Sequence, residues 1–258
     1  MTAVRQIMYF PGSQSVPGYP KLDVTDAELD VANIPSLKYW PGLFDWDVSE
    51  GVISDRMNDV VIPSYAASVP ANNFVTLPNG KKGYKVNAVA QALAMPVFNT
   101  GGSFTIGCVC DLQVGFGSLS VASANTDAPA PWYIYSDLAG SGAITASFGN
   151  VVIAQSTSAA WPQKLSSTKL TALVLIFDRD AGKISVRYNG VEMWSYTNAA
   201  VKNLSLFTEL YMGALRVAGA SAQVATRPMA SNAFTAFEAA LSGTELAALE
   251  RMLLEAAA

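Results

Sequence analysis

Three carboxylates stand close together in the segment Asp45-Trp46-Asp47-Val48-Ser49-Glu50. Two carboxyl groups about 5–5.5 Å apart can cleave a glycosidic bond, one as nucleophile and the other as acid and base. No second acidic motif accompanies this run, which follows an aromatic segment at residues 37–44. We therefore interpret it as a surface turn and assign no catalytic residue. A glycoside hydrolase remains the third of three functional hypotheses.

Aromatic residues and polar side chains gather in two loop regions. One group follows the proline-rich stretch at residues 127–131, and a further tryptophan lies in a loop of Ser, Ala and Pro. A sugar ring stacks on an indole face while neighbouring amides and carboxylates bond its hydroxyls. The alternative is that these rings pack beneath long loops. The predicted glycan-binding residues are Trp132, Tyr133, Trp161, Asn125 and Asp127.

Two oxygen-rich turns resemble partial calcium sites, since hard cations take several oxygen ligands from one turn. The groups are Asp178 and Asp180 with the Gly182 carbonyl, and Asp55, Asn58 and Asp59. The first turn lacks the regular ligand spacing of a calcium loop, and Arg179 adds a positive charge. We interpret both as solvated turns and predict no metal and no cofactor.

Composition excludes several kinds of chemistry. The chain of 258 residues has no histidine, which removes a Ser-His-Asp triad, a histidine-ligated zinc and a histidine pH switch. Its 16 Lys and Arg against 20 Asp and Glu give a net charge of −4, without the basic excess that nucleic-acid binding needs. No signal peptide and no membrane-spanning stretch is visible. We expect neither nucleic acid as a partner nor membrane insertion.

Cys108 and Cys110 are separated by one residue. On a strand, positions i and i+2 point to the same face, so the two sulfurs lie side by side and a bridge between them would be strained. We interpret them as small buried hydrophobic residues rather than a redox pair.

Residues 1–38 are interrupted by prolines and glycines and show no sustained period. We interpret them as an extended N-terminal arm, with a leader strand and loops lying along the same domain as the alternative. Thr25 is placed to cap a helical turn. Residues 39–258 then form the sandwich domain, and Tyr39, Trp40, Phe44 and Trp46 are expected to pack against the arm.

From residue 39 onward, short β-branched and aromatic runs recur at about 8–12 residues, the spacing of an all-β sandwich. The clearest segment, residues 169–196, predicts a three-strand meander whose second turn is Asn189-Gly190 in the type I′ conformation. Trp194, in this meander, is expected in the core. Residues 102–111 are apolar or small on both faces, so we expect a strand buried on both sides, with Gly107 admitting a neighbour closely.

The chain ends in a helical pattern. Ser242 and Glu245 fit a capping box, and Leu246, Leu249 and Leu253 form one apolar stripe. The pattern predicts one short helix packed on the sandwich, although its alanine-rich face would equally suit a partner chain.

Several of these segments occur in a family-specific order. They are Trp46-Asp47 with Asp55, Phe104-Thr-Ile-Gly-Cys-Val-Cys, Leu173-Val-Leu-Ile-Phe-Asp178, Gly182-Lys-Ile-Ser-Val-Arg-Tyr-Asn-Gly190, Leu210-Tyr-Met-Gly213, and residues 234–242 with Glu245. In this order they resemble the laminin-G-like, concanavalin A-like jelly-roll domains, over about residues 40–253. The resemblance implies a two-sheet antiparallel jelly-roll sandwich, and a module for binding or packing more than for chemistry.

The sequence departs from related patterns at two places. Asn232-Ala233-Phe234 stands where the family has an aspartate before its last hydrophobic pair, which puts a calcium site there in doubt. Laminarinase-like glucanases of the same fold carry E-x-D-x-x-E in mid-chain. Here Asp45 is one methylene too short, and the run precedes the long strands.

Low charge, a neutral hydroxyl-and-amide surface and the expected arm favour a non-enzymatic virion structural protein as our first hypothesis. It would be a bacteriophage tail, fibre or head-surface component, packing against other virion subunits or itself as a homo-oligomer such as a trimer. The alternative is a carbohydrate-binding or adhesion module of a bacterial surface or secreted protein. The two overlap, because a phage receptor binder grips cell-surface glycans. The expected location is the virion, or the cell surface and exterior.

Overall fold

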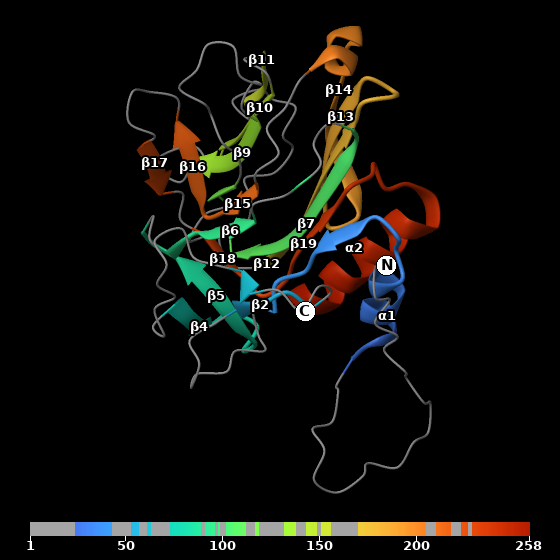
Figure 1. Cartoon of the computed structure of the whole chain (residues 1–258). Helices are drawn as coiled ribbons and strands as arrows, with labels where there is room; N and C mark the ends of the chain where they lie inside the picture. Colours follow the sequence, from blue (N-terminus) through green and yellow to red (C-terminus); the bar gives the residue numbers. More distant parts are fainter. Residues whose placement is uncertain are drawn as a thin grey trace, which may run out of the picture.

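The computed structural model describes residues 24–42, 53–56, 61–62, 73–88, 91–95, 98, 102–111, 117–118, 132–137, 143–148, 151–155, 170–204, 210–217, 223–226 and 229–258. At residues 54, 61, 117–118, 132–137, 143–148, 151–155, 215–217 and 223–226 it describes the backbone alone. Antiparallel strands dominate these segments and form two large sheets, with two helices beside one of them (Figure 1). The predicted all-β sandwich with a short C-terminal helix is therefore confirmed.

The first sheet has the strand order β1-β19-β7-β12-β13-β14. Its strands are β1 (Leu37–Tyr39), β19 (Phe234–Phe237), β7 (Phe104–Asp111), β12 (Leu170–Asp178), β13 (Lys183–Tyr188) and β14 (Val191–Thr197). The last three are the predicted meander. Asn189 and Gly190 have φ values of 46° and 81°, the positive values that a type I′ turn requires.

The second sheet has the order β11-β10-β9-β8-β15-β6. Its strands are β11 (Val151–Gln155), β10 (Ala143–Phe148), β9 (Trp132–Asp137), β8 (Gly117–Ser118), β15 (Leu210–Met212) and β6 (Leu93–Met95). Smaller sheets join β18 (Met229–Ser231), β5 (Lys82–Val86) and β4 (Phe74–Thr76); β16 (Ala214–Val217) and β17 (Gln223–Thr226); and β2 (Ile53–Ser54) and β3 (Val61–Ile62). The jelly-roll connection of these strands stays a prediction.

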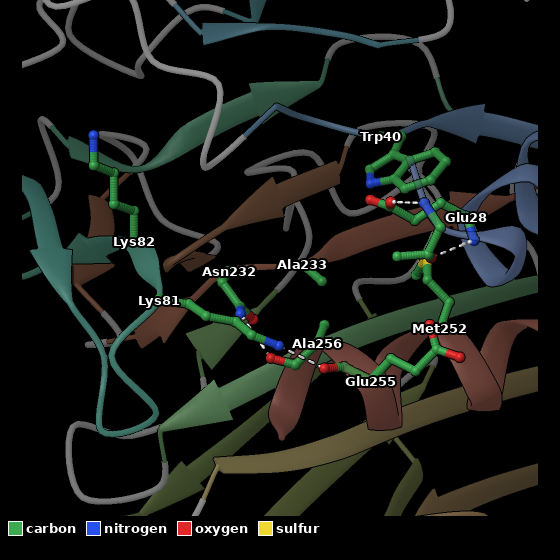
Figure 2. A pocket seen from close by; sticks show the side chains of 10 residues that line it. Glu28, Trp40, Lys81, Lys82, Asn232, Ala233, Met252, Glu255 and Ala256 are labelled. Atoms are coloured by element: carbon green, nitrogen blue, oxygen red, sulfur yellow. Dashed lines mark hydrogen bonds between the residues drawn. The ribbon is translucent and has the colours of Figure 1, made fainter. Parts of the chain in front are cut away.

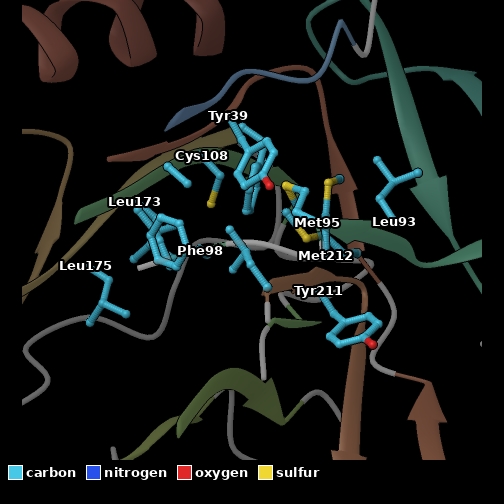
Figure 3. Packing of buried hydrophobic residues seen from close by; sticks show 14 of the residues in the cluster. Tyr39, Leu93, Met95, Phe98, Cys108, Leu173, Leu175, Tyr211 and Met212 are labelled. Carbon is cyan, nitrogen blue, oxygen red and sulfur yellow. The ribbon is translucent and has the colours of Figure 1, made fainter. Parts of the chain in front are cut away.

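The main core lies between the two sheets (Figure 3). Phe104 of β7 stacks on Phe177 of β12 with ring centroids 5.1 Å apart, and Phe98 meets the Phe104 ring edge-on at 5.6 Å. Met95 and Met212 of the second sheet are fully buried in the same cluster. Because apolar side chains of both sheets meet here, burial of this surface is the main force that holds the sandwich together.

Two aromatic predictions need correction. Tyr39 lies in the core between the sheets and not against the N-terminal segment, whereas Trp40 does pack with that segment. Neighbouring residues of an extended chain point to opposite sides, which separates the pair. Trp194 is only half-buried, because β14 is the edge strand of its sheet; its ring stacks on Tyr196 at 6.4 Å and borders the core.

A second core layer covers the outer face of the first sheet. Along β12, Leu173 and Leu175 face the other sheet, while Val174 and Ile176 belong to a cluster with two helices, α1 (Asp26–Ala32) and α2 (Gly243–Ala257). Figure 1 shows both helices on the side of β7 and β12 away from β9 and β10. An apolar run such as β12 is buried on both faces because a sheet covers one and helices cover the other. No helix in the described part of the chain is long and apolar enough to cross a membrane.

Residues 24–39 lie along this sandwich. Thr25 and Glu28 form a reciprocal capping box, in which the Glu28 N–H donates to Thr25 Oγ1 at 3.2 Å and the Thr25 N–H donates to Glu28 Oε2 at 2.9 Å. Ala27 and Val31 are buried, and β1 pairs with β19. Residues 24–39 thus form a helix and a strand packed on the sandwich, and the division of the chain into an arm and a sandwich stays a prediction. Residues 1–23 lie outside the described residues.

Gly107 of β7 is where α2 meets the sheet. A Cβ atom at this glycine would stand 2.9 Å from Leu249 Cδ1 and 3.0 Å from Leu253 Cδ1, so the predicted close neighbour is α2.

The helix α2 is also held by an ion pair. Arg187 Nε donates to Glu250 Oε1 at 2.6 Å, and this bond raises the pKa of the arginine. Ser242 is the N-cap as predicted, but its side chain makes no capping bond, so the predicted box at this helix is wrong.

The last carbonyls of α2 are satisfied by side chains from other segments. Lys81 Nζ donates to the Glu255 carbonyl at 2.6 Å, and the amides of Asn79 and Asn232 donate to the Ala256 carbonyl at 2.9 and 2.8 Å. The last turn of α2 has no basic residue. The ammonium of Lys81 therefore supplies the positive charge that a helix C-terminus favours.

We expect Gly107→Ala to destabilise the protein by about 1–3 kcal/mol, because the added methyl group crowds the ends of Leu249 and Leu253 and the Thr235 hydroxyl, which must repack. Urea denaturation followed by circular dichroism measures this loss. Gly102→Ala is the matched control, since a Cβ there meets nothing within 4 Å. Equal stability of the two variants would contradict the close packing.

Replacing Lys81 by Met should lower the free energy of unfolding by about 0.5–1 kcal/mol, since the last turn of α2 loses its cation. Lys82→Met removes the same charge from the next residue, which points away from α2 (Figure 2). Thermal melting of both variants at low ionic strength gives the comparison. If Lys82→Met lost as much stability, the helix contact would not be the cause.

Candidate functional site

The structure describes two of the five predicted glycan-binding residues, and only through their backbone. Trp132 and Tyr133 are neighbours on β9, where they pair with Phe148 and Ser147 of β10. Adjacent positions of a strand belong to opposite faces of its sheet, so a ligand on one face meets only one of these positions. Asn125, Asp127 and Trp161 lie outside the described residues, and the set stays a prediction.

The oxygen-rich turns have structural roles where they are described. Asp178 Oδ1 accepts the Ala181 N–H at 2.9 Å and so closes its own turn. Asp55 is only 2% exposed, and its Oδ1 accepts the backbone N–H of Trp40 at 2.8 Å. Among the described residues no group of three His, Cys, Asp or Glu side chains is placed to hold a metal ion. The residues Asn58, Asp59, Asp45, Asp47 and Glu50 lie outside the described segments.

Cys108 and Cys110 are buried and unbridged, with their sulfurs 3.3 Å apart on the inner face of β7. Burial raises the pKa of the Cys110 thiol well above its usual range. The burial of both unbridged thiols confirms their interpretation as small members of the core.

A cavity of about 280 Å³ lies on the helix-covered side of the first sheet (Figure 2). Segments far apart in the sequence enclose it: the start of α1, the segment after β1, the residues that enter β5, the corner between β18 and β19, and the end of α2. The lining residues used below are Glu28, Trp40, Lys81, Asn232, Met252 and Ala256.

The indole of Trp40 is held rigidly in this wall. Its backbone N–H is bound by Asp55, and the guanidinium of Arg56 lies over its ring, 5.0 Å from the centroid. Arg56 also pairs with Glu28 at 3.0 Å. Trp40 is 3% exposed, yet its indole Nε1–H has no hydrogen-bond partner within the described structure.

Asn232 presents the complementary group. It is 4% exposed; its Nδ2 donates to the Ala256 carbonyl, and its Oδ1 has no partner among the described residues. The bond to Ala256 fixes which end of the amide is which, because a flipped amide would set two oxygens against each other. The cavity therefore contains one buried donor and one buried acceptor, both unpaired.

The charged groups around the cavity are largely committed to the protein. Lys81 donates to the Glu255 carbonyl, and the Glu28 carboxylate accepts from the Thr25 N–H and from Arg56. Beside these charged groups, the cavity offers a small molecule a neutral donor, a neutral acceptor and apolar walls. Sequence patterns did not single out this site: they marked Trp40 only as a packing residue and Asn232 only as a departure from a family motif. The one sequence feature that pointed to this site is Asn232, which stands where the resembled family has an aspartate.

No protein-family model and no curated protein matches the chain. Solved structures do. Trypanosoma rangeli sialidase in complex with sialic acid has a TM-score of 0.56 at 15% identity, covering 85% of this chain and 33% of the sialidase. The binding domain of Paraclostridial Mosquitocidal Protein 1 has a TM-score of 0.52 at 11% sequence identity. The match covers 86% of this chain and 52% of that domain. The binding domain of Botulinum Neurotoxin DC in complex with SialylT has a TM-score of 0.50 at 10% sequence identity. This match covers 86% of this chain and 52% of that domain.

At these identities the similarity establishes the β-sandwich fold alone. The chain spans about half the length of the two toxin domains and a third of the sialidase. The three structures are one enzyme and two binding domains. None of the three is described as a laminin-G-like domain, and that resemblance stays a prediction.

Proposed function

We propose that the chain is a glycan-binding β-sandwich module without catalytic activity. The observation that carries the proposal is the likeness, over 86% of the chain, to two toxin binding domains, one of them solved with the ligand SialylT. The sialidase, which was solved with sialic acid, shares the fold as well. The sparingly charged composition supports the same function, since sugars are bound through rings, hydroxyls and amides rather than by charge.

The carboxylates of the described residues support binding rather than hydrolysis. Asp55 and Asp178 accept backbone N–H groups, and Glu28 and Glu250 are paired with arginines. A glycosidase needs two carboxyl groups that face one another across an open cleft. The engaged carboxylates are held by the fold, which favours a module that performs no chemistry.

The comparisons give more support to a carbohydrate-binding or adhesion module than to a virion subunit. None of the three structures reported above is described as a virion component. The virion location, the packing against other subunits and the trimer therefore stay predictions. We propose instead a module of a surface or secreted protein whose partners are cell-surface glycans.

Binding to a glycan array tests the proposal. We expect the full chain to retain at least one class of glycan, and Trp132→Ala or Trp161→Ala to weaken binding by about fivefold or more, because truncating an aromatic anchor costs more than about 1 kcal/mol. Trp194→Ala is the control, on the edge strand of the opposite sheet.

Each part of the proposal has an outcome that contradicts it. A blank array argues against glycan binding. Release of reducing sugar that disappears in Asp47→Asn or Glu50→Gln argues against a module without catalysis. Unchanged array signals in both tryptophan variants would show that glycans bind elsewhere on the chain.

A further inference from the structure

We propose that the cavity between α1 and the end of α2 binds one neutral, hydroxyl-bearing ring of monosaccharide size, with Trp40 and Asn232 as its polar contacts. The inference rests on the proposed glycan binding and gives that function a site distinct from the predicted aromatic set. Three properties of the cavity lead to it: its unpaired polar atoms, its size and its charge.

The unpaired atoms define the chemistry of the ligand. The Trp40 Nε1–H only donates and Asn232 Oδ1 only accepts, and both are buried without a partner among the described residues. Native proteins rarely leave such groups unsatisfied, so each one calls for a missing partner. Hydroxyl groups answer both needs, because a hydroxyl accepts from the indole and donates to the amide oxygen. A sugar ring carries several of them in fixed positions.

The size of the cavity suits one ring. Its volume of about 280 Å³ far exceeds the roughly 30 Å³ of a single water molecule. It lies just below the roughly 300–1,000 Å³ typical of sites for drug-sized molecules, as expected of a site for one small ring. Trp40, Met252 and Ala256 give it apolar walls, against which the C–H faces of a sugar can pack. An oligosaccharide would therefore place its terminal ring inside and its remaining rings outside.

The charge of the cavity favours a neutral ligand. The lining includes two lysines and two glutamates, and Lys81 and Glu28 are already bound by the protein. Lys82 and Glu255 are exposed and of opposite sign, and Figure 2 shows the Lys82 ammonium directed away from Asn232 and Trp40. The four formal charges of the lining cancel, and both unpaired polar atoms belong to neutral groups, so the cavity offers an acidic sugar no net attraction. The ligand expected here therefore differs from sialic acid and SialylT, the molecules bound in two of the similar structures.

NMR titration of the full chain tests the inference. The probes are the methyl glycosides of glucose, galactose, mannose and N-acetylglucosamine, with N-acetylneuraminic acid as the acidic sugar. We expect at least one neutral glycoside to bind and the acidic sugar not to bind. Trp40→Phe removes the indole donor and should raise the dissociation constant about tenfold, or about 1.4 kcal/mol. Trp194→Phe makes the same change at the far edge of the sheet and should leave binding unaltered.

A second variant protects the test against misfolding. Ala256→Met fills the cavity from a half-buried position in the last turn of α2 and leaves both polar contacts in place, so it should abolish binding while thermal melting stays close to wild type. The inference fails if no neutral glycoside binds, if only the acidic sugar binds, or if binding survives in both Trp40→Phe and Ala256→Met. Failure of every neutral glycoside to bind while the array signal stays intact would overturn this site and leave glycan binding standing, whereas a blank array would count against the proposed function itself.

Discussion

The seating of α2 on Gly107 is the contact on which the rest of the structure depends. β7 and β12 have apolar residues on both faces, and one face is covered by the second sheet. Without α2 the other face would expose Val109, Val174 and Ile176 to water, against the hydrophobic free energy that drives folding. A side chain at residue 107 would crowd the ends of Leu249 and Leu253. Because Gly107 has no side chain, the leucines of α2 can pack directly on β7 and form the second core layer.

Burial on this face also brings the two ends of the described chain together. α1 packs beside α2, with Arg251 and Asp30 paired across the contact. β1 then pairs with β19, the strand that leads to α2. A segment rich in prolines lies just before α1 in the sequence, and its punctuation suggested an arm; the apolar positions Ala27 and Val31 decide where residues 24–39 lie. Tertiary burial here outweighs a weak local pattern.

The strands and turns could be predicted from the sequence because their signals are local. Alternation along residues 183–188 and the Asn189-Gly190 pair are enough to define the meander, and the apolar run of residues 170–177 is enough to place a buried strand. The cavity could not be predicted, because it depends on contacts between residues 28, 40, 81, 232 and 256 that no local period encodes. Trp40 belongs to the core cluster under the helices and also lines the cavity, a double role that the sequence does not reveal. The capping box of α2 failed for a related reason, since Ser242 fits the pattern but its side chain makes no bond.

A cavity assembled from such distant segments has a thermodynamic consequence. Its walls exist only when α1, α2 and the corner between β18 and β19 are all in place, so the unfolded chain has no binding site to offer. Any occupant therefore binds the folded state alone and stabilises it through mass action, by about 2.7 kcal/mol at a concentration one hundred times its dissociation constant. A bound ligand would thus stabilise all the segments that form the outer face of the first sheet. The unfolding temperature of the protein would rise with the concentration of the ligand.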